Sequence, residues 1–415
     1  MNIHIVCIGT ELLIGHTLNT NLAFLGSSLE ALGFVVAQET CVPDFPAVMR
    51  DTFQRELAAA DVVITVGGLG PTSDDLTRGV AAEVLGAELE FHQHIHDRIA
   101  DFLTCRGVTL RRDALLVQSM VPRGATVLPN ENGTAPGLWC PAGDKLMILL
   151  PGPPRELQPM FTDHVLPRLV SRGAPRVSRR SLTVSGVPES IVEERVKKIL
   201  RNCSTVEPAY CARPSTVDIR LTATPAETAF LDHMAALVVE EFKREIIPPE
   251  DGDVVGSIAR LLTERHWTLA VAESCTGGLL GAELTARPGS SQWFSGGFIT
   301  YSNALKTACL DVPAETLTTY GAVSEATALA MVDGLLAKSG ADWGIAVTGI
   351  AGPGGGTPEK PVGRVYIAIA GPGYRRVFEQ TYPGNRENVR LRARATAFSE
   401  CRDMLLEASD HIPDV

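Results

Sequence analysis

The sequence predicts an α/β protein with several domains, and three observations support this fold class. Apolar segments of strand length alternate with amphipathic helical segments along most of the chain. The chain has 415 residues, and domains of about 150 residues then suggest two or three of them. A polar stretch rich in Pro and Gly, residues 247–253, separates two such patterns and is the strongest linker signal.

The first expected domain covers residues 1–170 and has the pattern of a doubly wound sheet. Residues 3–8 form an apolar run of strand length, and leucines then recur at helical spacing over residues 22–32. Further strands are expected at 61–66 and 146–150. Strands separated by helices predict a parallel sheet that helices cover on both faces.

A small α+β domain is expected at residues 176–250. It is expected to contain a strand, a helix, a strand and a helix, at 181–184, 188–200, 217–222 and 226–244. A block of this length suffices for a small linking domain between the two larger ones.

The last expected domain covers residues 254–415 and returns to the α/β pattern. Its expected strands are 268–272, 343–347, 365–370 and 377–382. A final helix is expected over residues 386–407, with Asn385 as its N-cap.

Composition excludes several classes of protein. The formal charge of −11 argues against general nucleic-acid binding, because such proteins usually show a basic surface. The nine cysteines are scattered without a C-x-x-C pair, which argues against a disulfide framework and a structural zinc site. No signal peptide and no membrane-spanning stretch is recognisable. We therefore expect a cytoplasmic protein without nucleic-acid or membrane partners.

Three polar, glycine-bearing segments each follow an expected strand of the first domain. They are GTELL at 9–13, GGLGPTSDDLT at 67–77 and PGPPRE at 151–156. Ligands of open parallel sheets bind outside the carboxyl ends of the strands, so the three segments should share one crevice. Glycines there let backbone N–H groups approach phosphate oxygens. Each segment by itself is also compatible with a tight turn or a helix cap.

The acidic pair in this region, Asp74 and Asp75, is the expected metal site. Two carboxylates on a phosphate-binding loop suit Mg²⁺ or Mn²⁺ bridged to a phosphate. The loop NGTAPG at 132–137 is a further candidate, with a structural role as its main alternative. The other residues expected to contact a ligand in this domain are Thr10, Glu11, Gly67, Gly68, Gly70 and Thr72.

The sharpest motif of the last domain is AESCTGG at 272–278, which follows a strand and opens a helix. It presents Ser274 near a helix N-terminus, where backbone N–H groups would stabilise developing negative charge. The glycine loop TGIAGPGGG at 348–356 suits a phosphate or a ribose edge, although it lacks the Gly-Lys-Ser/Thr ending of a P-loop. Arg386 and Arg390 lie one helical turn apart and would clamp a phosphate, unless they form a surface stripe with an acidic neighbour.

The residue types in these segments favour a serine nucleophile with a lysine base. No histidine lies in them, so a Ser-His-Asp triad is not expected. A serine activated by neutral Lys306, in the segment GGFITYSNALK, suits amide hydrolysis without a metal. Cys275 is the rival nucleophile, although such a cysteine is more often a small buried hydrophobe. The alternatives left open are a helix cap for Ser274 and a solvated helix position for Lys306.

These motifs together resemble the CinA (competence/damage-inducible) family over essentially the whole chain. The resemblance rests in front on GTELL, GGLGPTSDDLT, NGTAPG and LPGPPREL. At the back it rests on VAESCTGG, GGFITYSNALK, GAVSE, AVTGIAGPGGGTPEKPVG and the helix with Arg386 and Arg390.

The resemblance implies three domains, two activities and a homodimer. The last domain would be a nicotinamide-nucleotide amidase, which converts nicotinamide mononucleotide to nicotinic acid mononucleotide and ammonia. The first domain would have the molybdopterin-binding fold and hydrolyse ADP-ribose to AMP and ribose 5-phosphate with a divalent metal, Mg²⁺, Mn²⁺ or Co²⁺. The middle domain would be KH-like, but it lacks a basic G-x-x-G loop, so RNA binding is not expected.

The resemblance also implies residue roles. Ser274 would be the amidase nucleophile and Lys306 its general base, with Tyr301 and Thr348 as supporting polar groups. In the first domain Asp75 aligns with the single acid of molybdopterin-binding relatives, and Asp74 is an addition typical of this family. The residues implied to hold the amidase substrate are Thr276, Gly277, Gly278, Gly349, Gly352, Gly354, Gly355, Arg386 and Arg390.

Two alternative functions remain open at this point. The chain could be an amidase whose first domain only binds a nucleotide or a pterin, because this fold also occurs in proteins that do not hydrolyse nucleotides. It could also be a non-catalytic nucleotide-sensing protein connected with competence. A metal-dependent ADP-ribose assay separates the first alternative from a bifunctional enzyme, and substitution of Ser274 tests the second.

Overall fold

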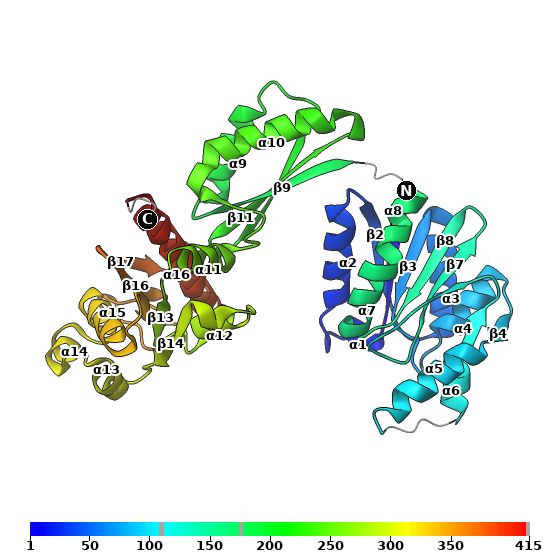
Figure 1. Ribbon diagram of the computed structural model, residues 1–415, viewed down its shortest axis with the longest axis horizontal. Helices are drawn as coiled ribbons and strands as arrows, with labels where there is room; N and C mark the ends of the chain where they lie inside the picture. Colours follow the sequence, from blue (N-terminus) through cyan, green and yellow to red (C-terminus); the bar gives the residue numbers. More distant parts are fainter. Residues whose placement is uncertain (108–111, 174–176, 412–415) are drawn as a thin grey trace. The chain divides into compact units, whose positions relative to one another are not determined.

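The computed structural model describes residues 1–107, 112–173 and 177–411, which form two compact units (Figure 1). The first unit comprises Met1–Arg179 with Ala223–Thr228, and the second comprises Arg180–Thr222 and the described residues from 229 onward. The expected start of the middle domain at residue 176 and the chain end at 412–415 lie outside the described residues. Each unit is described by itself.

The first unit is built on a six-stranded sheet with the strand order β2-β1-β3-β8-β7-β6. These strands are β1 Asn2–Ile8, β2 Val35–Val42, β3 Val62–Val66, β6 Thr126–Leu128, β7 Gly137–Ala142 and β8 Lys145–Leu150. A separate two-stranded sheet pairs β4 Leu89–Phe91 with β5 Met120–Pro122. The three strands expected from the sequence are therefore present as β1, β3 and β8, and they are neighbours.

The expectation of a purely parallel sheet is wrong at one edge. Strands β2, β1, β3 and β8 are parallel, but β7 runs antiparallel to β8, and β6 runs antiparallel to β7. The cause is a tight connection: Ala142 pairs with Lys145, so only Gly143 and Asp144 join the two strands. A two-residue turn can join only antiparallel strands, and the positive φ of Gly143 (66°) suits such a turn.

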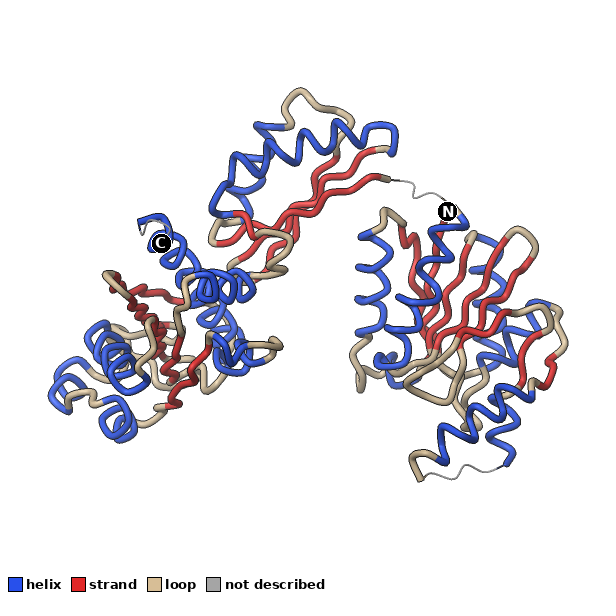
Figure 2. The backbone as a smooth tube through the Cα atoms, viewed as in Figure 1, coloured by secondary structure: helices blue, strands red, loops and turns tan. Residues whose placement is uncertain are grey.

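Helices cover both faces of this sheet, as the doubly wound pattern predicts (Figure 2). Side chains alternate along each strand, so Val63 and Met147 face one core while Val62 and Ile148 face the other. Helices α3, α4 and α5 pack in the first core, and α2, α7 and α8 pack in the second. The helices are α1 Thr10–Leu13, α2 Thr20–Ala31, α3 Pro46–Ala59, α4 Thr77–Leu85, α5 Gln93–Thr104, α6 Arg112–Gln118, α7 Pro154–Met160 and α8 Leu166–Arg172.

The middle part of the chain forms a four-stranded sheet with the order β10-β11-β9-β12. Its elements are β9 Ser178–Ser185, α9 Glu189–Ile199, β10 Glu207–Arg213, β11 Thr216–Ala223, α10 Thr228–Phe242 and β12 Ile246–Ile247. The expected β-α-β-α order is wrong because it omits β10 and β12. β10 is an edge strand with mostly exposed side chains, and β12 has two residues, so neither gives a readable apolar alternation.

The last part of the chain is a five-stranded mixed sheet with the order β14-β13-β15-β16-β17. The strands are β13 Leu269–Glu273, β14 Phe294–Ile299, β15 Trp343–Gly349, β16 Arg364–Gly371 and β17 Tyr374–Thr381. β13, β14 and β15 are parallel to one another. β16 runs antiparallel to β15, and β17 runs antiparallel to β16. The four expected strands are confirmed, but β14 was not expected, because its sequence FSGGFI carries two glycines and only a partly buried face.

Helices again cover both faces of this sheet. α11, α12 and α16 pack against one face and α13 and α15 against the other. The helices are α11 Val254–Glu264, α12 Leu279–Thr285, α13 Asn303–Leu310, α14 Ala314–Tyr320, α15 Glu325–Ser339 and α16 Arg386–His411. The expected N-cap of α16 is confirmed, because the Asn385 side chain accepts a hydrogen bond from the Asn388 N–H at 2.9 Å.

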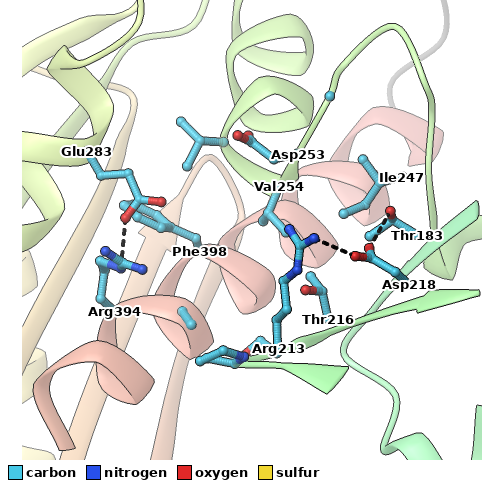
Figure 3. Close-up of a pocket in the computed structure, with 15 residues that line it drawn as sticks. Thr183, Arg213, Thr216, Asp218, Ile247, Asp253, Val254, Glu283, Arg394 and Phe398 are labelled. Atoms are coloured by element: carbon cyan, nitrogen blue, oxygen red, sulfur yellow. Dashed lines mark hydrogen bonds and ion pairs between the residues drawn. The ribbon is translucent and has the colours of Figure 1, made fainter. Parts of the chain in front are cut away.

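The middle and last parts of the second unit enclose a cavity of about 270 Å³ (Figure 3). On one side Asp218 pairs with Arg213 at 2.7 Å and accepts a hydrogen bond from Thr183. On the other side Arg394 of α16 pairs with Glu283 of α12 at 2.7 Å. None of the lining residues belongs to the motifs that the sequence singled out.

No described helix is both long enough and apolar enough to cross a membrane.

Candidate active sites

Ser274 lies at the carboxyl end of β13, in the centre of the parallel part of the last sheet. Its N–H donates to the Val347 carbonyl on β15 at 3.0 Å, and the Thr300 N–H after β14 donates to the Glu273 carbonyl at 2.8 Å. The three neighbouring strands therefore end at one edge, and Ser274 lies between the other two. Its side chain is nearly buried, with 7% of the residue surface exposed.

Lys306 contacts Ser274 directly. Its ammonium nitrogen lies 2.9 Å from Ser274 Oγ and 2.7 Å from the Thr300 carbonyl oxygen. The helix that carries it, α13, begins at a Ser302 cap, whose hydroxyl accepts from the Leu305 N–H. Lys306 is only 1% exposed, so it is not a solvated helix residue.

Burial changes the acid–base chemistry of Lys306. Removal from water disfavours the ammonium form and lowers the pKa of Lys306 to about 8. Near physiological pH, a substantial fraction of the protein molecules then carries Lys306 in its neutral form. A neutral lysine within hydrogen-bond distance of a serine hydroxyl has the geometry and the basicity of a general base.

The rival nucleophile is disfavoured by the same burial. Cys275 is 5% exposed, and desolvation raises the pKa of its thiol to about 11. The thiol therefore stays protonated at neutral pH, and a protonated thiol is a poor nucleophile. Cys275 packs in the apolar core on the side of α11, α12 and α16, as a small hydrophobe would.

The structure reveals a role for Glu273 that the sequence interpretation missed. Its carboxylate accepts three backbone hydrogen bonds at the start of α12, from Gly278 at 2.8 Å, Leu280 at 3.2 Å and Gly281 at 2.9 Å. The expectation that the α12 N-terminus stabilises charge on a substrate is therefore wrong for these amides. The signal in the sequence was an acid directly before Ser274, a few residues ahead of the glycines that open the helix.

The two arginines of α16 connect three motifs. Arg386 donates to the Gly352 carbonyl at 2.8 Å and to the Tyr301 hydroxyl at 3.0 Å. Arg390 donates to the Thr276 carbonyl at 2.7 Å. The pair therefore draws the serine turn, the Tyr301 segment and the glycine loop toward one place, and it is not a plain surface stripe.

The glycine loop is constrained by its neighbours. Gly352 has φ of 83°, and a Cβ there would lie 2.6 Å from Val362 Cγ1. A Cβ on Gly349 would lie 2.6 Å from Val365 Cγ2. Gly355 also has a positive φ, 86°, whereas a side chain on Gly354 would meet open space. The positions of Gly352 and Gly355 therefore favour glycine because of their positive φ, and that of Gly349 because of its close neighbours.

Three other residues were expected at the Ser274 site, and each has different contacts in the structure. The Thr348 hydroxyl donates to the Ala322 carbonyl at 2.7 Å, so it holds the GAVSE loop. The Thr276 hydroxyl is buried and has no partner among the described residues. Tyr301 is 59% exposed and contacts the serine–lysine pair only through its carbonyl, 3.5 Å from Lys306 Nζ.

In the first unit, the three glycine segments and the NGTAPG loop line one crevice at the carboxyl edge of the sheet. The lining includes Gly67, Gly68, Gly70, Glu11, Asp74, Asp75, Thr134, Gly152 and Glu156. The Thr77 hydroxyl donates to the Gly67 carbonyl at 2.8 Å, and a Cβ on Gly68 would overlap that hydroxyl. The convergence expected from the sheet topology is therefore present.

The acids of this crevice are partly occupied by protein donors. Asp75 Oδ2 accepts from the N–H of Thr72 at 2.8 Å and from its hydroxyl at 2.5 Å, so one oxygen of this expected metal ligand is already bound by protein donors. Asp44 Oδ2 accepts from the N–H and hydroxyl of Thr10. Within the described residues, no three His, Cys, Asp or Glu side chains are grouped closely enough to hold a metal ion.

Several crevice residues were not singled out from the sequence. Asp44 lines the crevice and follows β2. This edge strand is partly polar and was not recognised as a strand, so the residue after it was not considered. Glu156 belongs to the PGPPRE segment, but the sequence analysis assigned it no role. The Asn130 side chain donates to the Glu156 carboxylate at 2.8 Å, and a Cβ on Gly133 would overlap that carboxylate. Gln118 reaches the crevice from α6 and donates to the Thr134 hydroxyl at 3.1 Å. Its contribution depends on the fold and has no local sequence signal.

Three family models match this chain in succession. Residues 4–171 match "Probable molybdopterin binding domain". Residues 179–247 match "Damage-inducible protein CinA KH domain", and residues 252–405 match "CinA C-terminal domain".

Two curated proteins are similar to this chain over nearly its whole length, and a solved structure is similar to part of it. A CinA-like protein of Dictyoglomus thermophilum is 39% identical over 98% of this chain and 100% of its own length. A CinA-like protein of Gemmatimonas aurantiaca is 40% identical over 97% of this chain and 96% of its own. The crystal structure of competence damage-inducible protein A from Klebsiella pneumoniae is 38% identical, and the match covers 38% of this chain and 97% of that chain with a TM-score of 0.37.

Proposed function

Because the chain belongs to the CinA family, we propose that its last domain hydrolyses nicotinamide mononucleotide to nicotinic acid mononucleotide and ammonia. The observation that carries the proposal is the buried contact between Lys306 Nζ and Ser274 Oγ at 2.9 Å. A nucleophile and a base within hydrogen-bond distance, with the pKa of the base lowered to about 8, suit attack on an amide.

The reaction follows from these two side chains. Neutral Lys306 removes the proton of Ser274 Oγ as the oxygen attacks the amide carbon, which forms the tetrahedral intermediate. The C–N bond then breaks, and the ammonium form of Lys306 returns its proton to the departing nitrogen, so that ammonia leaves. Water, deprotonated by Lys306, next attacks the acyl-serine ester, and its hydrolysis gives the carboxylate product and restores Ser274.

Features around Ser274 support a ring-bearing nucleotide as the substrate. Ile299 and Tyr301 are 57% and 59% exposed, and a Cβ on Gly278 would lie 3.2 Å from the Ile299 side chain. An exposed aliphatic side chain and an aromatic one beside the serine turn suit a flat aromatic amide. Arg386 and Arg390 supply positive charge for the phosphate.

Ammonia release from nicotinamide mononucleotide by the full-length chain, with EDTA present, tests this function. The native chain is expected to release ammonia, and Ser274→Ala is expected to release none. Retained release by Ser274→Ala would move the nucleophile to another residue. No release by the native chain would overturn the proposed substrate.

For the first domain we propose a metal-dependent ADP-ribose pyrophosphatase. The observation that favours it is the crevice where glycine segments meet the carboxylates of Asp74, Asp75 and Glu156. Carboxylate oxygens are suitable ligands for a divalent cation, and a substrate phosphate would have to supply the remaining ligands, since the described acids form no group of three. Such a cation would offset the repulsion between the substrate's phosphates and the acids.

Formation of AMP and ribose 5-phosphate from ADP-ribose, with Mg²⁺, Mn²⁺ or Co²⁺ added in turn, tests this second function. Turnover with at least one of the three metals is expected. Saturable binding of ADP-ribose without turnover would instead make this domain a nucleotide-binding module. Absence of both would overturn the assignment of ADP-ribose to the crevice.

A further inference from the structure

Glu273 is a buried carboxylate with an unusual set of partners. It is 1% exposed, and it lies immediately before Ser274 at the end of β13. Both carboxylate oxygens accept hydrogen bonds, Oε2 from the N–H groups of Gly278 and Leu280 and Oε1 from that of Gly281. Such bonds, together with the positive end of the helix dipole, compensate the cost of burying the charge.

The bonds of Glu273 close a ring around the serine turn. The turn begins at Ser274 and ends at Gly278, and the Glu273 side chain joins the backbone before the turn to the amides after it. Ser274 itself is tied to β15 through the bond from its N–H to the Val347 carbonyl. The position of the nucleophile is thus fixed on one side by the sheet and on the other by Glu273.

The backbone of the same residue reaches the base. The Glu273 carbonyl accepts from the Thr300 N–H at 2.8 Å, and the Thr300 carbonyl accepts from Lys306 Nζ at 2.7 Å. Glu273 therefore contacts both the turn that carries Ser274 and the residue that holds the Lys306 ammonium group. A shift of Glu273 would change the distance between nucleophile and base from both ends.

Glu273 is not itself a catalytic base. Its two oxygens are used by backbone donors, and the residue is closed to solvent. The buried position also differs from that of Glu283, the other acid of this region, which lies on α12 and pairs with Arg394.

We propose that Glu273 is the positioning residue of the amidase, which sets the distance between Ser274 and Lys306 by holding the first amides of α12. The proposal rests on Ser274 as the nucleophile of the proposed function, but it does not depend on which amide is the substrate. Its consequence is that α12 serves the nucleophile turn and leaves the substrate's developing charge to other groups.

Two substitutions of Glu273 separate the effect of its negative charge from the effect of its side-chain length. In Glu273→Gln, one oxygen becomes an NH₂ group that faces the Gly281 N–H, so an acceptor is replaced by a donor. In Glu273→Asp, the charge remains, but the shorter side chain cannot reach the same amides. If position matters, both variants lose activity, whereas a purely electrostatic role would spare Glu273→Asp. Glu283→Gln is the matched control, with the same chemical change on the adjoining helix.

The experiment measures two rates on the full-length chain. One is covalent labelling of Ser274 by a fluorophosphonate, which reports the reactivity of the serine without the substrate. The other is ammonia release from nicotinamide mononucleotide. We expect both Glu273 variants to label at least about tenfold more slowly and to lose kcat by a similar factor, with KM within about threefold of native. Glu283→Gln is expected to stay within about twofold of native.

A pH profile distinguishes misplacement from general disruption. If the pocket of Lys306 is intact, the pH midpoint of labelling stays near 8 in the Glu273 variants, as the buried lysine predicts. Native labelling rates in folded Glu273→Gln, or a labelling midpoint that moves toward that of an ordinary lysine, would overturn the proposal. Labelling that depends on Glu273 without any ammonia release would keep this proposal and reject only the substrate.

Discussion

At the scale of single residues, the last domain depends on a lysine that the fold removes from water. Lys306 lies 2.9 Å from Ser274 Oγ and is 1% exposed. This position makes Lys306 the base that we propose for Ser274, and burial lowers its pKa to about 8. The neighbouring Cys275 is buried as well, but burial raises its pKa. Burial therefore favours the neutral, basic form of the lysine and the protonated, less nucleophilic form of the thiol.

Replacement of Lys306 tests its role as the base. We expect Lys306→Ala to lower the amidase kcat about 10²-fold or more, because proton transfer from the serine loses its acceptor. Lys306→Arg should be equally impaired, since a guanidinium stays protonated. The measurement is steady-state ammonia release. Near-native activity of Lys306→Arg would show that the site needs a positive charge rather than a base.

The amidase rate should also depend on pH in a defined direction. The pKa of Lys306 is lowered to about 8, and only the neutral form accepts the serine proton. The rate should therefore rise as pH increases from 6 and level off above about 8 to 9. A profile of kcat/KM between pH 6 and 10 measures this midpoint. A midpoint near 10.5, the usual value for lysine, would contradict a buried base.

At the scale of elements, residues of the proposed sites come from several segments that helices and glycine turns bring together. Arg386, in the first turn of α16, donates both to the glycine loop and to the Tyr301 hydroxyl. We expect Arg386→Ala to raise KM for nicotinamide mononucleotide about tenfold with a smaller change in kcat, because a phosphate contact is lost. Arg392→Ala, six residues further along the same helix, is the control and should leave both constants unchanged. A loss of kcat alone would contradict a phosphate-binding role.

The turn after β3 supplies a matched test in the first domain. Gly68 has φ of 66°, and a Cβ there would overlap the Thr77 hydroxyl. We expect Gly68→Ala to abolish ADP-ribose hydrolysis while ammonia release stays within about twofold of native. Gly79→Ala is the control, because that glycine lies in α4 and a Cβ would meet nothing within 4 Å. Equal activity of the two variants would exclude the crevice as the hydrolytic site.

At the scale of the whole molecule, the two activities that we propose differ in their metal requirement, although they belong to one chain. We expect EDTA to stop ADP-ribose hydrolysis and to leave ammonia release unchanged, because the serine–lysine pair needs no metal. We also expect Ser274→Ala to keep full ADP-ribose hydrolysis. Both activities should be measured on one preparation. Loss of ammonia release with EDTA would reject the proposed mechanism of the last domain.

The α/β class of both larger domains can be predicted from the sequence alone, because strands buried on both faces and amphipathic helices leave readable periodicities. The sequence also singled out Ser274, Lys306 and the glycine segments, since these lie in continuous motifs. It did not predict the other strands, which are short, peripheral, polar or glycine-bearing and have weak apolar alternation: β2, β4, β5, β6 and β7 in the first unit, and β10, β12 and β14 in the second.

The contacts between these residues could not be predicted without the folded structure. The distance between Ser274 and Lys306 depends on the parallel pairing of β13 with β14, which joins positions 32 apart in the chain. The occupation of the α12 amides by Glu273 and of Asp75 by Thr72 depends on side-chain placement. Burial, which lowers the pKa of Lys306, is likewise a property of the packed sheet and helices, and no local pattern in the sequence contains it.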